Sequence, residues 1–113
     1  MPLSKKYRIS KEKELKNVFS AGRTIRNPFL FLKFMKNNLD HPRFAVSVSK
    51  KIYKRAVKRN LAKRRIYHVL GQAKFLKEKN NFDIVITLTG DILREDFKKI
   101  KTEIEDTISK IFV

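Results

Sequence analysis

The chain has 113 residues, the size of one domain, and its 42% of hydrophobic residues exclude a wholly disordered protein. A formal net charge of +17 predicts a polyanionic partner, with nucleic acid ahead of an anionic membrane surface. No apolar run approaches the ~20 residues of a membrane span. The absence of Cys excludes disulfides and thiolate metal sites, no signal peptide is visible, and we expect a cytoplasmic protein.

The positive charge is concentrated in the middle of the chain. Residues 1–40 carry ten basic and three acidic side chains (net +7), and residues 78–113 carry six and eight (net −2). Residues 41–77 carry twelve basic side chains and no acidic one. A surface that serves only solubility mixes both signs, so this segment is the predicted binding region.

The first predicted helix follows Ser10, which we expect to be its N-cap, and ends at Gly22. An apolar stripe with spacing i, i+3, i+4 consists of Leu15, Val18 and Phe19. A helix of about ten residues needs tertiary support, so we expect this stripe to pack on a sheet or helix.

Two β-rich segments come after a small strand expected at 24–26. Residues 29–35 have apolar side chains on both faces, which predicts that protein or ligand covers both faces at least partly. Residues 43–49 alternate between apolar and small or polar side chains. A loop rich in Asn, Asp and Pro separates the two segments, and we predict that they pair as an antiparallel hairpin.

The C-terminal part predicts one more strand and one more helix. The strand is FDIVITLT, residues 82–89, and Asp91 is expected to cap the last helix. Apolar residues from Leu93 to Ile111 recur in that helix at steps of three and four. The order α-β-β-β-α-β-α predicts a single α+β domain over residues 1–113 with a mostly antiparallel central sheet.

The stretch KRAVKRNLAKRRIY, residues 54–67, has seven basic residues among fourteen. At about 100° per residue one face collects Arg59, Asn60, Lys63, Arg64 and Tyr67. The side chains expected to seat the helix on the sheet are Val57, Leu61, Ala62, Ile66 and Val69. This phasing predicts a helix with an outward cationic ridge instead of a disordered tail, followed after Gly71 by a Lys-rich link.

The segment VSVSKK followed by AVKRNLAKRR resembles the signature of the bacterial ribonuclease P protein subunit. In that family a strand ending in V-S-K-K leads through a short loop into an A-V-x-R-N-x-x-K-R helix. The resemblance extends to ELKNVFSAGR, to an Asn-led strand, to the D-I-V-I strand and to the closing helix. This chain departs from the family in a longer loop without Gly at 52–55, and in Leu61 and Tyr67, where the family tends to have Arg.

The resemblance implies the small subunit of a ribonucleoprotein endonuclease that removes the 5′ leader from precursor tRNA. Its implied partners are ribonuclease P RNA and that leader, and neither a membrane nor DNA is expected. Catalysis is expected in the RNA with magnesium, and the protein alone is expected to bind no cofactor or metal and to supply no catalytic residue. The implied fold is an α-β sandwich with a left-handed crossover through the basic helix, against the usual right-handed preference.

The resemblance, together with the run of cations at residues 50–65 and the strand pattern at residues 29–35, gives two groups of predicted site residues. The predicted RNA-binding residues are Lys50, Lys51, Lys54, Arg55, Lys58, Arg59, Asn60, Lys63, Arg64 and Arg65. The predicted leader-binding cleft, between the first helix and the sheet, comprises Leu15, Phe19, Phe31 and Lys33. A slip of one residue in the strand would exchange the last two for Leu30 and Phe34. We expect the remaining aromatics Phe29, Phe44, Phe82 and Phe97 to fill the core.

Three alternatives stay open from the sequence. His41 and His68 could form a general acid–base pair, although neither has a carboxylate close in sequence. Composition alone also allows another basic RNA-binding protein, such as a ribosomal protein. A helix-turn-helix DNA reader fits less well, because the basic helix follows a strand and lacks a preceding partner helix.

Overall fold

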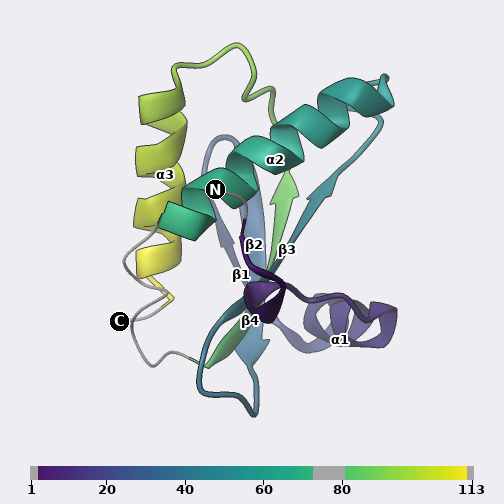
Figure 1. Cartoon of the computed structure of the whole chain (residues 1–113), viewed down its shortest axis with the longest axis vertical. Coiled ribbons are helices and arrows are strands. Elements are labelled where there is room, and N and C mark those ends of the chain that lie inside the picture. Colours follow the sequence, from purple (N-terminus) through teal and green to yellow (C-terminus); the bar gives the residue numbers. More distant parts are fainter. Residues whose placement is uncertain (1–2, 73–80, 112–113) are drawn as a thin grey trace.

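The computed structural model describes residues 3–72 and 81–111, which form a four-stranded sheet and its covering helices (Figure 1). In chain order the elements are η1 (Lys5–Tyr7), α1 (Glu12–Ala21), β1 (Arg23–Arg26), β2 (Leu30–Lys36), β3 (Arg43–Val48), α2 (Ala56–Gln72), β4 (Phe82–Leu88) and α3 (Phe97–Ser109). Apart from the one-turn 3-10 helix η1, this is the order of elements that the sequence predicts.

The strand order is β1-β2-β4-β3, so the last strand in the sequence lies inside the sheet. β2 runs antiparallel to β1 and to β4, whereas β3 runs parallel to β4. The predicted hairpin of β2 with β3 is therefore wrong. β4 separates them because its side chains are largely buried on both faces, which suits a central position, while those of β3 alternate more.

The connection from β3 through α2 to β4 joins two parallel neighbours. In Figure 1, α2 lies in front of the sheet, and the chain passes from β3 on the right to β4 on its left with both strands pointing upward. This geometry makes the crossover left-handed. The predicted fold class, a mixed α+β domain with this crossover, is confirmed.

The main core lies between one face of the sheet and the helices α2 and α3. Alternate residues of each strand point into it, as the pleat requires. From β2 and α3 it receives Leu30, Leu32, Phe34, Ile100, Ile104 and Ile108. Phe97, expected to fill the core, is instead 37% exposed, because it begins α3 and its ring lies beside His68, with 6.1 Å between the ring centroids.

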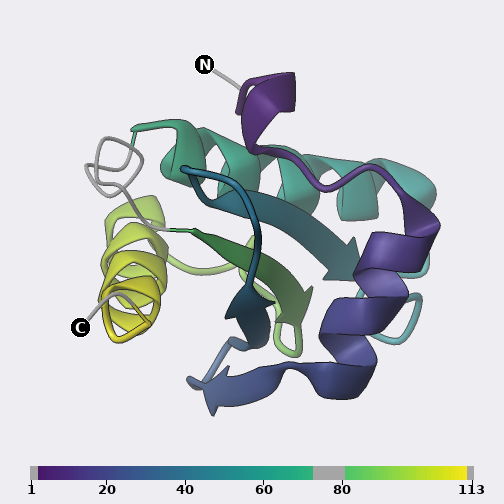
Figure 2. The ribbon, with the colours of Figure 1, turned by 90° about the horizontal axis from the view of Figure 1, so that it is seen from below.

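Among the described helices α1 is the one that covers the opposite face of the sheet, and Figure 2 shows α1 and α2 on opposite sides of the strands. A second, smaller cluster forms there from Ile9, Val18, Ala45 and Val85, with Leu15 and Met35 packed against it. Because α1 is short, it covers only part of this face. The rest of the face is open for a ligand.

The side chains through which α2 packs on the sheet differ from the prediction at the first turn of the helix. Ala62, Ile66 and Val69 are buried as expected, but Val57 is 77% exposed. Val57 precedes Ala62 by five residues, which places it about 140° around the helix axis from the buried stripe. The helix therefore packs through its middle and its C-terminal half.

Both predicted helix caps are wrong. α1 begins at Glu12 with Lys11 in the N-cap position, because the backbone N–H of Ile9 donates to the carbonyl oxygen of Phe44 (2.9 Å) and keeps the preceding chain extended. α3 begins six residues after Asp91, at Phe97, and Asp96 caps it by accepting from the N–H of Lys98 (3.1 Å). α2 continues past Gly71, where the helix was expected to end, to Gln72. Most of the expected Lys-rich link lies outside the described residues.

Candidate nucleic-acid interface

The predicted RNA-binding residues come from one stretch of the chain, between the end of β3 and the third turn of α2. Two lie in the turn after β3, two in the loop that follows, and six on the first three turns of α2. Most of them are exposed, while Arg59, Lys63 and Arg65 are half-buried. Within the described ranges none of these cations forms an ion pair. Their charge is therefore available to an external anion.

Arg59 does not simply project outward as predicted. Its Nη1 group donates to the carbonyl oxygens of Tyr53 (3.0 Å) and Lys54 (2.8 Å), so the side chain folds back over the loop. The cause is its angular position, which borders the buried stripe of α2. Arg59 thus fixes the backbone of the loop that carries its cationic neighbours.

A buried tyrosine anchors the same loop from the other side. The hydroxyl of Tyr53 donates to Oδ1 of Asp91 (2.6 Å) and accepts from the backbone N–H groups of Ile92 (2.9 Å) and Leu93 (3.2 Å). Burial, followed by the hydrogen bond to Asp91, raises the pKa of Tyr53, and that hydroxyl lowers the pKa of Asp91. The loop at residues 52–55 is longer in this chain than is usual in the family that the sequence resembles. These hydrogen bonds attach it to the segment between β4 and α3.

The open face of the sheet carries polar and aromatic side chains in rows across the strands. Strand register places Arg26, Phe31, Thr87 and Ser47 side by side in one row. The next row consists of Thr24, Lys33, Val85 and Ala45. The Cζ of Arg26 lies 5.3 Å from the centroid of the Phe31 ring, within the range of a cation–π contact.

The structure brings the four predicted cleft residues to this face. Phe31 and Lys33 alternate with residues of the main core, and the alternative pair Leu30 and Phe34 lies in that core. Leu15 packs in the small cluster under α1, and Phe19, one turn further along the helix, is 39% exposed. Contact of these residues with a nucleic acid stays a prediction.

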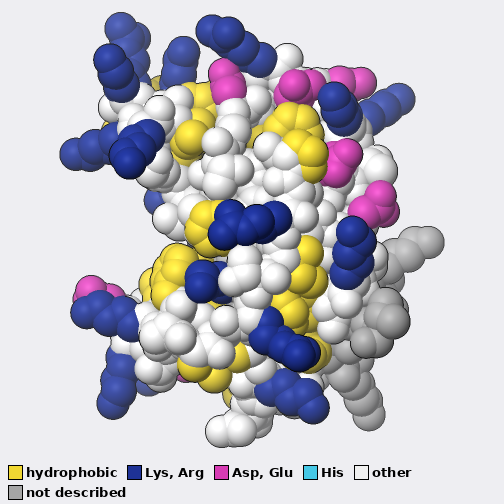
Figure 3. All heavy atoms as spheres, turned by 180° about the vertical axis from the view of Figure 1, so that it is seen from behind, with side chains coloured by type: hydrophobic (Ala, Val, Ile, Leu, Met, Phe, Trp, Pro, Cys, Tyr) yellow, Lys and Arg dark blue, Asp and Glu magenta, His cyan; other side chains and the backbone are white. Residues whose placement is uncertain are grey.

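Figure 3 shows the α1 side of the molecule in space-filling form. Hydrophobic side chains are visible across its centre, with Lys and Arg side chains beside them. One edge is hollowed between the lobe that contains α1 and the lobe at the N-terminal end of α2. A surface with apolar, aromatic and cationic groups in alternation suits unpaired nucleotides, whose bases stack and whose phosphates pair with cations.

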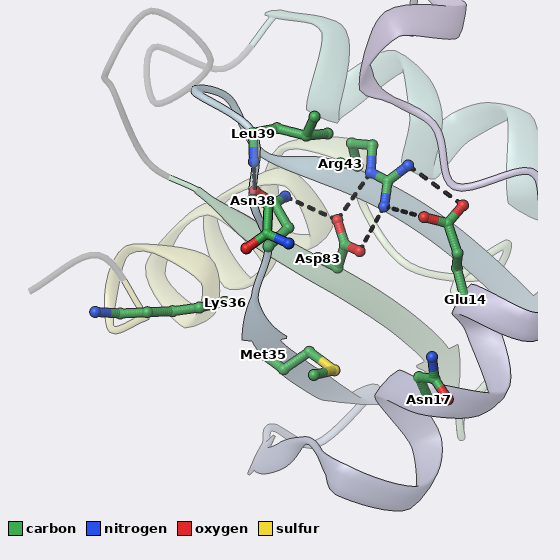
Figure 4. Close-up of a pocket in the computed structure, with 9 residues that line it drawn as sticks. Glu14, Asn17, Met35, Lys36, Asn38, Leu39, Arg43 and Asp83 are labelled. Carbon is green, nitrogen blue, oxygen red and sulfur yellow. Dashed lines mark hydrogen bonds and ion pairs between the residues drawn. The ribbon is translucent and has the colours of Figure 1, made fainter.

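On its other flank α1 is fixed to the sheet by an ionic cluster that the sequence did not reveal (Figure 4). Arg43 donates to both carboxylate oxygens of Asp83 (2.9 and 2.7 Å) and, through Nη2, to Oε2 of Glu14 (2.7 Å). These hydrogen bonds raise the pKa of Arg43 further above its usual range. The Nδ2 group of Asn37 completes the cluster by donating to Asp83 (2.8 Å).

The cluster borders a cavity of about 240 Å³ between α1 and the loop after β2. Glu14 and Phe19 are five residues apart, so they lie on different flanks of α1 at about 100° per residue. The ionic cluster therefore holds the helix from one side while the open face lies at the other. It positions α1 without occupying the surface available to a ligand.

Two further residues on the α1 side of the sheet escaped prediction, Arg26 on the open face and Arg43 in the ionic cluster. Arg26 could have been suspected, because its position in a short strand alternates with the apolar Ile25, which packs against the main core. Arg43 could not, because its partners stand 29 and 40 residues away in the sequence. Pairs at such separations follow from the sheet topology and leave no local pattern.

The remaining side chains that could act in acid–base catalysis or bind a metal ion lie on separate elements. His41 lies edge-on to Tyr7, with 5.4 Å between the ring centroids, and His68 lies beside Phe97 on another element. Among residues 3–72 and 81–111, no three His, Cys, Asp or Glu side chains gather in a group that could hold a metal ion. In the same ranges no helix is both long and apolar enough to cross a membrane.

Comparison with known proteins places the chain in a family. The family model described as Ribonuclease P matches residues 3–111. The Ribonuclease P protein component of Thermoanaerobacter sp. (strain X514) is 35% identical over 103 residues, which are 91% of this chain and 87% of that protein. The solved RNase P protein of Staphylococcus aureus is 26% identical, with a TM-score of 0.78 and coverage of 93% of this chain and 94% of that one.

The RNase P protein of Thermotoga maritima has the same fold at 22% identity, with a TM-score of 0.75 over 92% of this chain and 93% of that one. The family match spans all described residues, including α2, the loop before it and the open face of the sheet. The chain belongs to the ribonuclease P protein family.

Proposed function

We propose that this chain is the protein component of ribonuclease P and acts within that endoribonuclease by binding RNA. The observation that carries the proposal is the run of nine cations among the predicted contact residues from Lys50 to Arg65, whose charges no described acidic side chain neutralises. The family match supports the same function, and the ribosomal-protein alternative gains no support from it. The partner follows as ribonuclease P RNA.

The chemistry is assigned to the RNA subunit. In this proposal the RNA, with magnesium ions bound to it, cleaves the phosphodiester bond. The protein supplies cations that displace condensed counterions, so its affinity for the RNA falls with salt by about 0.7 to 0.9 logarithmic units per phosphate contacted. Because these cations also reduce repulsion between RNA segments, the complex needs less magnesium than the RNA alone.

The 5′ leader of precursor tRNA is the proposed ligand of the open sheet face. A leader is single-stranded, and an aromatic surface accepts unpaired bases of any sequence by stacking, at about 1–3 kcal/mol per base. Phe31 with Arg26 above it, together with Lys33, offers one ring and two cations in adjacent rows. The exposed Phe19 adds a second ring from α1. Such a complex acts where tRNA is made, which places this chain in the cytoplasm.

Reconstitution tests the proposal directly. The purified chain is added to a bacterial ribonuclease P RNA at a magnesium concentration too low for the RNA alone, and cleavage of precursor tRNA is followed. We expect cleavage at the 5′ end only when both components are present. Cleavage by the chain without RNA would overturn the assignment of catalysis to the RNA subunit. Failure to bind or activate the RNA would overturn the proposed function.

A further inference from the structure

The segment before α1 is an integral part of the fold. Leu3 is buried in the main core. Arg8 forms a parallel β-bridge with Phe44, and the N–H of Ile9 donates to the carbonyl oxygen of Phe44 at 2.9 Å. The segment therefore runs along β3, whose other side pairs with β4, and covers the edge of the sheet next to α2.

Within this segment Arg8 occupies an unusual environment. Its Cζ lies 4.5 Å from the centroid of the Tyr67 ring, which places the guanidinium over the aromatic face. Its Nε is buried without a hydrogen-bond partner in the structure. Among the described residues no carboxylate pairs with Arg8. A half-buried guanidinium with an aromatic neighbour and no anion is incompletely satisfied by its own protein.

The tyrosine beneath Arg8 is itself fixed. Its hydroxyl accepts the backbone N–H of Val46 at 3.2 Å, and the ring packs against the main core. Tyr67 follows Lys63 by one helical turn and Arg59 by two, so these three lie along one flank of α2. Arg8 extends this flank beyond the last cation that the helix provides there, and the exposed Lys5 and Lys6 continue it along the N-terminal segment.

We propose that Arg8, held in place by the Tyr67 ring, is an RNA-binding residue that joins the N-terminal segment to the cationic flank of α2. The ligand group is a phosphate of the ribonuclease P RNA, and this inference rests on the proposed function. A stacked arginine suits such a contact, because its planar fork is already ordered before it binds. The flank lies on the opposite side of the sheet from the open face with Phe31, so the RNA subunit is the partner and the leader is not.

The test measures the salt dependence of binding to isolated ribonuclease P RNA, without substrate. Arg8→Gln is expected to reduce the slope of log K against log salt by about 0.7 to 0.9, the share of one phosphate contact. The matched control is Arg23→Gln, which removes the same charge from β1 at the other edge of the sheet. We expect the control to leave the slope unchanged.

Two further variants separate binding from a purely structural role. Arg8→Lys keeps the charge and is expected to restore the slope, whereas Tyr67→Leu removes the ring that holds Arg8 and is expected to reduce the slope as Arg8→Gln does. All variants are compared where circular dichroism and urea unfolding show them to be folded. An unchanged slope for folded Arg8→Gln would overturn the inference.

The experiment distinguishes failure of this inference from failure of the proposed function. If the unmodified chain fails to bind the RNA, the proposed function is wrong and the inference falls with it. If the unmodified chain binds with a steep salt dependence and Arg8→Gln behaves identically, only the inference is wrong. The inference would also be wrong if Arg8→Gln left binding to the isolated RNA unchanged and weakened only the binding of leader-bearing precursor tRNA to the holoenzyme. The contact would then belong to the substrate.

Discussion

At the scale of single residues, the hydroxyl of Tyr53 makes three hydrogen bonds in a buried position. Tyr53→Phe leaves the carboxylate of Asp91 and the buried N–H of Ile92 without this partner, which costs about 1–3 kcal/mol. We expect the free energy of unfolding, measured in urea, to fall by that amount. Tyr7→Phe is the control, since no described residue hydrogen-bonds to the Tyr7 hydroxyl.

The hydrogen bond between Tyr53 and Asp91 also predicts how the stability of the protein depends on pH in the acid range. Asp91 has a lowered pKa in the folded protein, so its contribution to stability is complete above the ordinary value of about 3.9 and is lost as the pH falls through the lowered pKa. Tyr53→Phe removes the main cause of the lowering. We expect stability to decrease less steeply below about pH 4 in this variant than in the unmodified chain. Parallel curves for the two proteins would refute the coupling.

Two phenylalanines of nearly equal exposure test the leader site. Phe19→Ala is expected to weaken binding of leader-bearing precursor tRNA by about 1–3 kcal/mol, or roughly 5- to 150-fold, while sparing mature tRNA. Phe97→Ala removes a ring of similar exposure from α3 and should affect neither substrate. Equal weakening of both tRNAs by Phe19→Ala would show that this residue is not part of a leader site.

At the scale of elements, the position of α1 depends on the ionic cluster at Arg43. Glu14→Gln removes the carboxylate that α1 contributes, and we expect the helix to lie less firmly over the sheet. The predicted result is a several-fold loss of affinity for leader-bearing precursor tRNA, measured on the assembled holoenzyme. Glu12→Gln is the matched control, because Glu12 lies on the same helix in an exposed pair with Lys16.

For α2 the prediction concerns which residues seat the helix. Val57→Ala and Val69→Ala delete the same atoms from one helix, the first from an exposed position and the second from the core. We expect Val57→Ala to change the free energy of unfolding by less than about 0.5 kcal/mol, and Val69→Ala to lower it by about 1–3 kcal/mol. A large cost at Val57 would contradict the observed orientation of α2.

At the scale of the whole molecule, a net charge of +17 opposes compaction through self-repulsion. Multivalent anions should therefore stabilise the free protein by occupying its cationic surface. We expect the urea midpoint to rise more with sodium sulfate than with sodium chloride at equal ionic strength. Equal shifts would mean that general screening accounts for the whole effect.

Much of the fold could be predicted from the sequence, because each element has its own local pattern. The isoleucines of α3 recur with a helical period, and Phe44 alternates with small residues as a half-covered strand requires. The phasing of the basic stretch identified α2 as a helix. The helix starts were missed because they depend on tertiary bonds, such as the one from Ile9 to Phe44, and not on the nearest capping residue.

The pairing of strands lay beyond local reasoning. β2 and β3 are adjacent in sequence, and their separation depends on burial of β4 on both faces, a property of the finished sheet. The predicted contact residues on α2 could be named one by one from a local pattern, whereas Arg43 and Arg8 could not. The partners of these two arginines are brought to them only by the completed topology.

The central place of β4 also bears on synthesis. A ribosome releases β1, β2, β3 and the entire basic helix before it makes the strand that joins β2 to β3. Until residue 82 emerges, β3 lacks the strand with which it pairs in the sheet, and α2 has no complete surface on which to pack. Completion of the sheet is thus postponed to the last third of translation, and until then the most cationic segment of the nascent chain lacks the full surface on which it packs, in an environment rich in RNA.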